Sequence, residues 1–383
     1  MFELVFLLLP IAVAYGWFMG RRSVSIAEQN QQKKRSKNYF NGLNYLLTQE
    51  ADKAVDLFIN LLEVDDDTID THMSLAALFR HKGEVERAIR IHQNIMTRPQ
   101  LSIVQRDFAL LELGRDYVAA GFYDRAEQTL VSLIEQDEHT LEAEKELLAV
   151  YQVTKEWQKA INIILGMSKQ EAQEFTELLA HFYCEQADQE QTVKTKVKRY
   201  QQALVRHPEC SRAILALAEH YFSTNDLVTA ITYSERLLSV DPSIFNQLLN
   251  IISRSNIDNQ SLIKLLENAV SNKAGVSAVL LLVEQYLKLN KQHLAEELIL
   301  RQLKKHPTLK GFKKLMDLFI DKVEEGKTKH SLELLSQLVE QQINSHPKFS
   351  CRNCGFEVHS LYWHCPSCHS WSTIKPVTGL NGE

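Results

Sequence analysis

Two patterns of apolar and polar residues divide this chain. From about Tyr39 to Pro347, short segments with apolar residues at helical spacing alternate with polar turns. In six of these segments an aromatic residue is followed by a polar or glycine-containing turn and, nine residues after the aromatic, by an alanine. The six alanines are Ala54, Ala88, Ala126, Ala160, Ala230 and Ala295. The pattern predicts amphipathic helix pairs stacked in a row, because neither helix of such a pair can bury its apolar stripe alone.

The spacing of these alanines indicates the type of repeat. Ala54 and Ala88 are 34 residues apart, and this period is typical of the tetratricopeptide repeat. The clearest unit resembles that family at Leu113, Gly114, Tyr117, Gly121, Tyr123 and Ala126. Two longer intervals leave room for degenerate units near residues 183–208 and 245–270. We therefore expect a solenoid of roughly eight or nine helix pairs over residues 38–347.

Two residues depart from the repeat pattern on the predicted second helices. His92 and Ser234 stand where the family carries a large apolar side chain. The alternative interpretation is a generic helical bundle with accidental periodicity, although six phased matches favour the repeat. Stacked helix pairs form a groove that binds peptides or protein surfaces, so the predicted function is binding.

A different pattern occupies the N-terminus. Residues 2–20 carry a single charge, at the edge of an apolar run, and a helix of this length spans about 28 Å, close to the hydrocarbon thickness of a bilayer. Basic residues follow the run. This order predicts a transmembrane anchor over residues 1–20 and a polar basic linker over residues 21–37, with the N-terminus outside and the bulk of the chain in the cytoplasm. A buried core helix and a cleaved signal peptide are the alternatives.

Composition and charge narrow the functional classes. Glycine (13 of 383 residues) and proline (8) are scarce, which disfavours turn-rich all-β folds. The net charge of -5 lacks the positive field of a nucleic-acid binder, so no nucleic-acid partner is expected. A local basic stretch is either a partner or membrane patch or a solvated helix end: Lys304, Lys305, His306, Lys310, Lys313 and Lys314. No phosphate-binding loop, hydrolase motif or dinucleotide fingerprint occurs, so we predict no enzymatic activity and neither catalytic nor cofactor-binding residues.

Four of the six cysteines lie close together near the C-terminus. Cys351 and Cys354 form one CxxC pair, Cys365 and Cys368 form another, and ten residues separate the pairs. Two such pairs supply four thiolates to one metal ion, so we predict a metal site made of these cysteines in a module over residues 348–383. A filled four-sulfur shell leaves no open position for a substrate, which indicates a structural ion, with zinc preferred and iron as the alternative. Structural thiols or disulfides are the other interpretation, and disulfides are disfavoured in the cytoplasm.

The two knuckles resemble those of rubredoxins and zinc ribbons, with a glycine after Cys354 and a proline after Cys365. His369 stands where rubredoxins have glycine, and the spacer is shorter than theirs; both departures count against electron transfer. Five aromatic residues are expected to pack around the knuckles and to dock the module on the last repeats: Phe349, Phe356, Tyr362, Trp363 and Trp371. The isolated Cys184 and Cys210 are predicted to be small core residues without companions or chemistry.

Over its whole length the chain resembles the lipopolysaccharide assembly protein B family of Gram-negative bacteria. The most specific stretches are FLLLPIAVAYGWFMGRR, GEVERAIRIHQ and LYWHCPSCHSWSTIKP. The resemblance implies a single-pass inner-membrane adaptor, with a periplasmic N-terminus, that regulates lipopolysaccharide synthesis. It also implies three protein partners: a membrane AAA+ zinc protease, the lipid A pathway deacetylase that this protease degrades, and an inner-membrane protein that senses lipopolysaccharide.

The predicted fold is all-α. A tetratricopeptide-repeat solenoid follows one N-terminal transmembrane helix and precedes a small rubredoxin-like or zinc-ribbon module. Two functional alternatives stay open: a rubredoxin-like iron redox protein coupled to a protein-binding repeat scaffold, and an RNA-linked ribbon adaptor, which the charge disfavours. The oligomeric state stays open as well, a homo-oligomer included.

Overall fold

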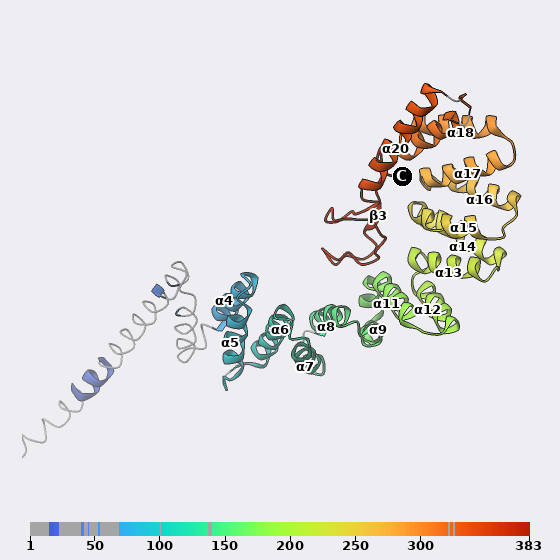
Figure 1. Ribbon diagram of the computed structural model, residues 1–383. Helices are drawn as coiled ribbons and strands as arrows, with labels where there is room; N and C mark the ends of the chain where they lie inside the picture. The colour runs from blue at the N-terminus through green and yellow to red at the C-terminus, as the bar shows by residue number, and fades with distance from the viewer. Residues whose placement is uncertain are drawn as a thin grey trace, which may run out of the picture. The chain divides into compact units, whose positions relative to one another are not determined.

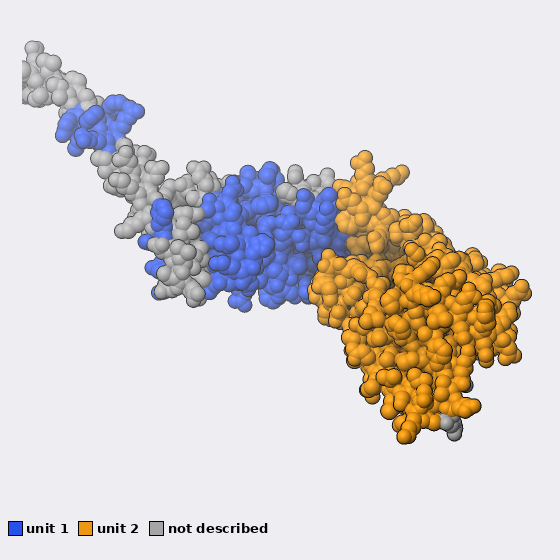
Figure 2. Space-filling view, turned by 90° about the horizontal axis from the view of Figure 1, so that it is seen from above, with its two compact units in different colours: residues 1–156 blue, residues 157–383 orange. Residues whose placement is uncertain are grey.

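The computed structural model describes most of the chain from residue 69 onward (Figure 1). The described residues are 15–22, 40, 41, 45, 53, 69–99, 101–136, 140–320, 322–324 and 326–383. Most of the predicted anchor and linker, and Ala54 of the first repeat, lie outside them. Within the described ranges, no helix combines the length and the apolar character that crossing a membrane requires. The chain divides into two compact units, residues 1–156 and 157–383 (Figure 2).

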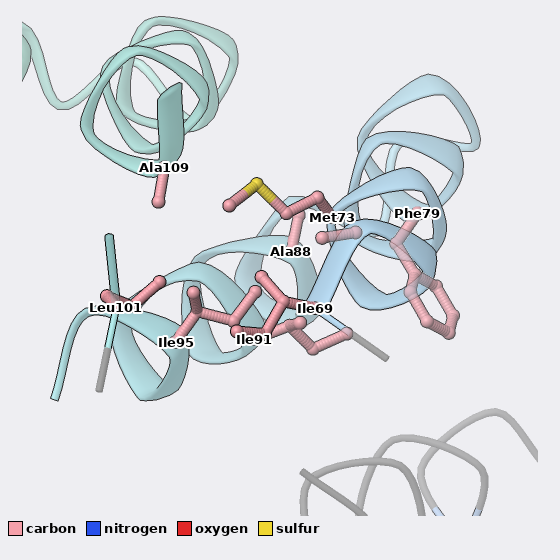
Figure 3. Packing of buried hydrophobic residues seen from close by; sticks show 9 residues of the cluster. Ile69, Met73, Phe79, Ala88, Ile91, Ile95, Leu101 and Ala109 are labelled. Atoms are coloured by element: carbon pink, nitrogen blue, oxygen red, sulfur yellow. The ribbon is translucent and has the colours of Figure 1, made fainter. Parts of the chain in front are cut away.

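Unit 1 contains helix pairs of the expected kind. Its helices in the described part are α4 (Ile69–His81), α5 (Val85–Met96), α6 (Ile103–Ala119), α7 (Tyr123–Ile134) and α8 (Thr140–Thr154). A capping box fixes the start of α6, because the Ser102 hydroxyl accepts from the Gln105 amide and the Gln105 side chain accepts from the Ser102 amide. Figure 3 shows the apolar core between α4, α5 and α6: Ile69, Met73, Ala76, Phe79, Ala88, Ile91, Ile95, Leu101 and Ala109.

A largely buried polar network joins the same three helices, α4, α5 and α6. The Asp116 carboxylate, which is fully buried, accepts a hydrogen bond from Arg80 at 2.8 Å and lies 2.5 Å from His92 Nδ1. Arg80 also donates to Glu112 at 2.7 Å. Burial opposes ionisation of Glu112, but hydrogen bonds from Arg80 and Arg115 hold the pKa of its carboxyl below the usual value. His92 therefore departs from the repeat pattern because its ring pairs with a buried carboxylate.

Unit 2 continues the helix pairs and ends in three short strands. Its helices are α9 (Trp157–Gly166), α10 (Lys169–Glu174), α11 (Thr176–Gln189), α12 (Val193–Arg206), α13 (Ser211–Ser223), α14 (Leu227–Val240), the 3-10 helix η2 (Pro242–Gln247), α15 (Leu249–Arg254), α16 (Asn259–Ser271), α17 (Val276–Lys288), α18 (Gln292–Lys305), α19 (Leu309–Ile320) and α20 (Lys327–Ser345). The strands are β1 (Phe349–Cys351), β2 (Glu357–Val358) and β3 (Ile374–Pro376). In Figure 1 the helices from α11 to α20 form an arc, and the strands lie in its opening.

The two degenerate repeats are also formed by helices. The first consists of α11 packed on α12, and in the second the short segments η2 and α15 precede α16. Ala203 of α12 and Ala269 of α16 are completely buried, as are the signature alanines of the clearer units that the structure describes. A small buried residue on the second helix therefore persists where the rest of the signature is lost. Ser234, the other departure, is buried because its hydroxyl donates to the Ala230 carbonyl at 2.8 Å.

The turns inside the helix pairs share one backbone conformation. Gly83, Gly121, Asn225 and Asn290 follow the first helices of their pairs and have φ angles of 81°, 75°, 62° and 57°. Glycine reaches this left-handed region without penalty, and asparagine tolerates it better than most residues. In the turn between α8 and α9 the same conformation is adopted by a lysine, Lys155, with a φ angle of 60°. Glycine and asparagine thus explain four of these turns, and all five positions are glycine or polar, as in the sequence pattern.

Leucine at Ala126 is expected to destabilise unit 1. Ala126 is fully buried on α7, which packs on α6, and an added Cβ at Gly114 would lie 2.7 Å from Leu130 Cδ2. Because this crossing has no spare room, we expect Ala126→Leu to lower the free energy of unfolding by about 1–3 kcal/mol, measured by urea denaturation. Ala119→Leu, at an exposed position of α6, is the control. An unchanged denaturation midpoint for Ala126→Leu would contradict the expectation.

Candidate metal centre

The cysteine module is a three-stranded antiparallel sheet with strand order β2-β1-β3. Phe349 of β1 pairs with Val358 of β2 and with Pro376 of β3. The buried core of the module contains four residues: Phe349, Cys351, Cys365 and Ile374. A core of this size supplies little stability by itself, so the module needs a further cross-link.

The structure brings the four predicted ligands together. All four sulfurs lie within 4.8 Å of one another. The Sγ atoms of Cys351 and Cys368 are 3.7 Å apart, as are those of Cys354 and Cys365. Four sulfurs placed tetrahedrally at about 2.3 Å from an ion are about 3.8 Å from each other, so both separations fit a shared ion. The cluster can therefore hold one metal ion, and its donor set suits zinc and iron alike.

The backbone explains why each CxxC pair forms a knuckle. The Gly355 amide donates to the Cys351 carbonyl and the His369 amide to the Cys365 carbonyl, each at 2.9 Å. Gly355 and His369 have φ angles of 77° and 56°. Glycine adopts this conformation freely, whereas histidine accepts a cost of about 1–2 kcal/mol. The second knuckle thus has the same turn as the first, although His369 stands where rubredoxins have glycine.

Hydrogen bonds to two of the sulfurs favour their thiolate forms. The Thr373 hydroxyl lies 3.3 Å from Cys351 Sγ and lowers the pKa of that thiol. The Ser370 hydroxyl lies 3.5 Å from Cys368 Sγ and lowers the pKa of Cys368 to about 5. Cys365 is fully buried, and burial raises its pKa to about 11. Because thiolates are the form that binds metal, the site releases protons when an ion binds.

The nearby histidines have other contacts. In the part of the chain that the structure describes, the only group of side chains close enough to share an ion is the set of four cysteines. The His364 ring lies 4.5 Å from the Trp371 ring and 5.4 Å from the His369 ring. His359 is exposed.

Trp371 connects the module to helices far upstream in the sequence. Its ring stacks on His181 of α11 at 4.9 Å and meets Phe182 and Trp157 edge-on at 6.2 and 6.4 Å. The Ser372 hydroxyl lies 2.7 Å from His181 Nε2. For Trp371 the expected docking on the last repeats is therefore wrong. The helices of unit 2 curve into an arc, and this places Trp371 against α9 and α11. Phe349 does pack beside the knuckles, whereas Phe356 and Tyr362 are exposed.

Polar contacts attach the rest of the module. Lys375 of β3 donates to Asp241 at 2.6 Å. The Glu383 carboxylate accepts from the Ser277 amide at 2.9 Å and from Lys310 at 2.5 Å. Burial opposes ionisation of Glu383, but the charge of Lys310 holds the pKa of this carboxyl below its usual value. Together with Trp371, these contacts tie the module and its tail to helices from α9 to α19.

Acidification is expected to weaken unit 2 through His181. This side chain is 2% exposed, and burial lowers its pKa below the usual 6.5, although the contact with Glu177 opposes the shift. As the pH falls below about 6.5, the unfolded chain binds a proton that the folded ring resists. Below that pH, the free energy of unfolding therefore decreases as the pH is lowered. Above it, the ring is neutral in both states, and its protonation does not change the free energy of unfolding.

The comparison of wild-type protein with His181→Gln isolates this contribution, because glutamine cannot ionise. Thermal midpoints measured between about pH 7.5 and 5 should fall less steeply in the variant than in the wild type. Protonation of the cysteines in the module occurs in both proteins, so the difference between the two slopes reports the substitution at position 181. Identical pH dependence in the two proteins would rule out a contribution from His181.

Cys184 and Cys210 are closer together than the sequence indicates. Both are buried, as predicted, but their sulfurs are 4.0 Å apart, so neither lacks a companion. Burial raises the pKa of Cys184 well above its usual value. Beside them, Arg212 donates to Glu185 at 2.8 Å and to Asp188 at 2.6 Å. Twenty-six residues separate the two cysteines, and only the packing of α11 against α13 brings them together.

Family models match two segments of the chain. Residues 349–376 match the rubredoxin metal binding domain, in a model for the zinc ribbon of lipopolysaccharide assembly protein B. Residues 197–243, from α12 to η2, match the tetratricopeptide repeat. These matches confirm the predicted types of both the helical repeats and the cysteine module.

Curated relatives extend the match to the full chain. Lipopolysaccharide assembly protein B of Escherichia coli K12 is 39% identical over 396 residues and covers 100% of both chains. The Haemophilus influenzae protein of that name is 36% identical over 394 residues and covers 99% of each. A solved structure of Naa15/Naa10 bound to HypK-THB covers 78% of this chain and 52% of its own at 15% identity, with a TM-score of 0.33, too low to compare folds. Identity at this level over the full length shows that the chain belongs to the lipopolysaccharide assembly protein B family.

Proposed function

We propose that this chain is an inner-membrane adaptor that regulates lipopolysaccharide synthesis by bringing the lipid A pathway deacetylase to a membrane AAA+ protease. The observation that carries the proposal is the 36–39% identity over the full chain to relatives named lipopolysaccharide assembly protein B. The helix pairs support a binding role, because stacked repeats offer an extended surface to protein partners. A lipopolysaccharide-sensing inner-membrane protein is the third proposed partner.

The proposed anchor is residues 2–20, with a periplasmic N-terminus and the remainder of the chain in the cytoplasm. Its support is the apolar run followed by basic residues. An anchored scaffold shares the plane of the membrane with the protease. Any client that it holds is therefore kept at a high effective concentration near the protease.

The proposed metal ion is a structural zinc held by Cys351, Cys354, Cys365 and Cys368. The two sulfur separations of 3.7 Å support a shared tetrahedral ion. When bound, the ion cross-links the two knuckles and fills its shell with sulfur. Elemental analysis of purified protein should give one zinc for each chain. Bound iron, with visible absorbance that changes reversibly on reduction, would favour the redox alternative.

Deletion of the proposed anchor tests the adaptor function. In cells without their own copy of the gene, a chain lacking residues 1–20 should remain folded but fail to lower the level of the deacetylase. Replacing residues 2–20 with an unrelated membrane helix should restore turnover, because the proposal needs membrane attachment. Turnover at the wild-type rate in the truncated protein would overturn the anchored-adaptor proposal.

A further inference from the structure

The basic stretch at residues 304–314 is neutralised only in part. Three of its lysines form ion pairs: Lys310 with Glu383, Lys313 with Asp317, and Lys314 with Glu284. Lys305 has no acidic partner among the residues that the structure describes, and it lines a cavity. Ion pairs therefore neutralise the lysines in the second half of the stretch, whereas the charge of Lys305 stays unpaired beside the cavity.

This cavity has a volume of about 680 Å³ and is lined by α16, α17, α18 and the tail that follows β3. Its floor is apolar and includes the buried side chains of Val276, Val279 and Leu298. Leu380 of the tail also lines it and is 53% exposed. A volume of this size, with an apolar floor, is typical of a ligand site.

Three cations surround the apolar floor. Arg301 and Lys305 are four residues apart on α18, so their side chains share one face of the helix. Lys273 follows the end of α16 and is exposed. Among the described residues, none of the three forms an ion pair, and Glu383 is the one acidic side chain that lines the cavity. Lys310 and Ser277 already bind Glu383, and none of the three cations is ion-paired with it.

The tail of the chain shows how this region binds a peptide segment. The Leu380 carbonyl accepts from the Leu309 amide at 2.8 Å. The Glu383 carboxylate accepts from the Ser277 amide in the first turn of α17, where helix amides are free to bind anions. An added Cβ at Gly275 would lie 2.7 Å from Glu383 Oε2, so a glycine leaves room for this carboxylate. One backbone hydrogen bond and one carboxylate thus hold the tail beside the cavity.

From this geometry we propose that the cavity binds an acidic peptide segment of a partner protein. A carboxylate of the segment pairs with Arg301, Lys305 and Lys273, and a neighbouring apolar side chain covers the floor next to Leu380. The unpaired cations select an anion, and the tail is a peptide segment already held beside the cavity by Ser277, Leu309 and Lys310. The proposal deepens the adaptor function and rests on it in one respect, since the partner protein is taken to be one that the adaptor binds. Peptide binding to the cavity can be measured without deacetylase or protease.

The test selects peptides from a random library displayed on phage, using the full-length protein in nonionic detergent. Enriched peptides are then synthesised with a fluorescent label, and their affinities are measured for wild type and for the double variant Arg301→Glu, Lys305→Glu. We expect peptides with an acidic residue next to an apolar one, at least about tenfold weaker binding to the variant, and weaker binding at high salt. The control variant Lys264→Glu, Lys288→Glu makes the same change in net charge at exposed positions away from the cavity and should bind like wild type.

Three results would overturn the proposal. One is a library with no enriched peptide, and another is a set of enriched peptides whose affinity the cavity variant leaves unchanged. The third is binding of a dodecyl phosphate probe that depends on Arg301 and Lys305 while no peptide does, which would assign the cavity to a lipid-like anion. Failure of deacetylase turnover in cells with intact peptide binding would overturn the adaptor function alone, so the two proposals fail separately.

Discussion

Cys365→Ser is expected to unfold the cysteine module and to release its metal ion while the helix pairs stay folded. Cys365 is fully buried, its Sγ is 3.7 Å from that of Cys354, and it belongs to the four-residue core of the module. Structural zinc sites contribute an apparent 10–16 kcal/mol, roughly, to the folding of small domains. With so small an apolar core, the loss of one thiolate removes most of the stability of the module.

The variant should also lose the contact of the module with α9 and α11. Trp371 stacks on His181 only when the second knuckle is formed, so its fluorescence should shift toward that of a solvated tryptophan. Elemental analysis should show less than one bound ion for each chain, and circular dichroism should retain the helical signal. Cys184→Ser, which removes a buried thiol outside the module, is the control and should keep its metal. Full metal content and an unchanged tryptophan signal in Cys365→Ser would count against a structural ion.

The same variant separates the module from the adaptor function. If the module holds the arc of unit 2 through Trp371, Lys375 and Glu383, its unfolding frees contacts that span α9 to α19. Deacetylase turnover should then fall even though the repeats and the proposed anchor are intact. Normal turnover with an unfolded module would show that the helix pairs and the anchor suffice.

Asp116→Ala is expected to destabilise unit 1 by about 3–5 kcal/mol. The Asp116 carboxylate is fully buried and pairs with both Arg80 and His92. Removing it takes one of two carboxylate partners from the half-buried guanidinium of Arg80 and leaves the buried imidazole of His92 without this partner. Both costs add to that of the cavity left behind. Urea denaturation should show the loss as a lower midpoint than that of the wild type.

Asp107→Ala is a matched control on the same helix, α6. Asp107 is 1% exposed, but neither of its carboxylate oxygens has a hydrogen-bond partner among the described residues. Its replacement therefore breaks no ion pair and relieves the cost of burying a carboxylate, so we expect little loss of stability or a gain. Equal losses for Asp107→Ala and Asp116→Ala would mean that the pairing with Arg80 and His92 contributes nothing of its own.

The helix pairs and the cysteine cluster could both be predicted because their signals are local in sequence. A helix pair needs an apolar stripe, a small residue at the crossing and a turn residue that accepts positive φ, and all three occur within one repeat. Gly121 and Ala126 illustrate this, since the first forms the turn and the second is fully buried. A CxxC knuckle is equally local, so the spacing of Cys351 and Cys354 was enough to predict a ligand pair.

Contacts between distant residues left no such signal. His92 reads as a defect in the repeat because its partner, Asp116, lies on another helix 24 residues away. Trp371 reads as a docking residue for the last repeats, whereas it packs on His181, whose hydrogen-bond partner Ser372 is 191 residues away in sequence. The cavity beside Arg301 and Lys305 is likewise lined in part by Leu380 and Glu383 of the tail, which lie far from α18 in sequence.

The sequence by itself determined the type of repeat, the cysteine module with its two CxxC pairs, and the family, because periodicity and short spacings encode local packing and local turns directly. The tertiary structure decided where the module docks, which charges are paired and which face an open cavity. Those outcomes depend on the small rotation between successive helix pairs, which accumulates over many repeats and is specified by no single residue.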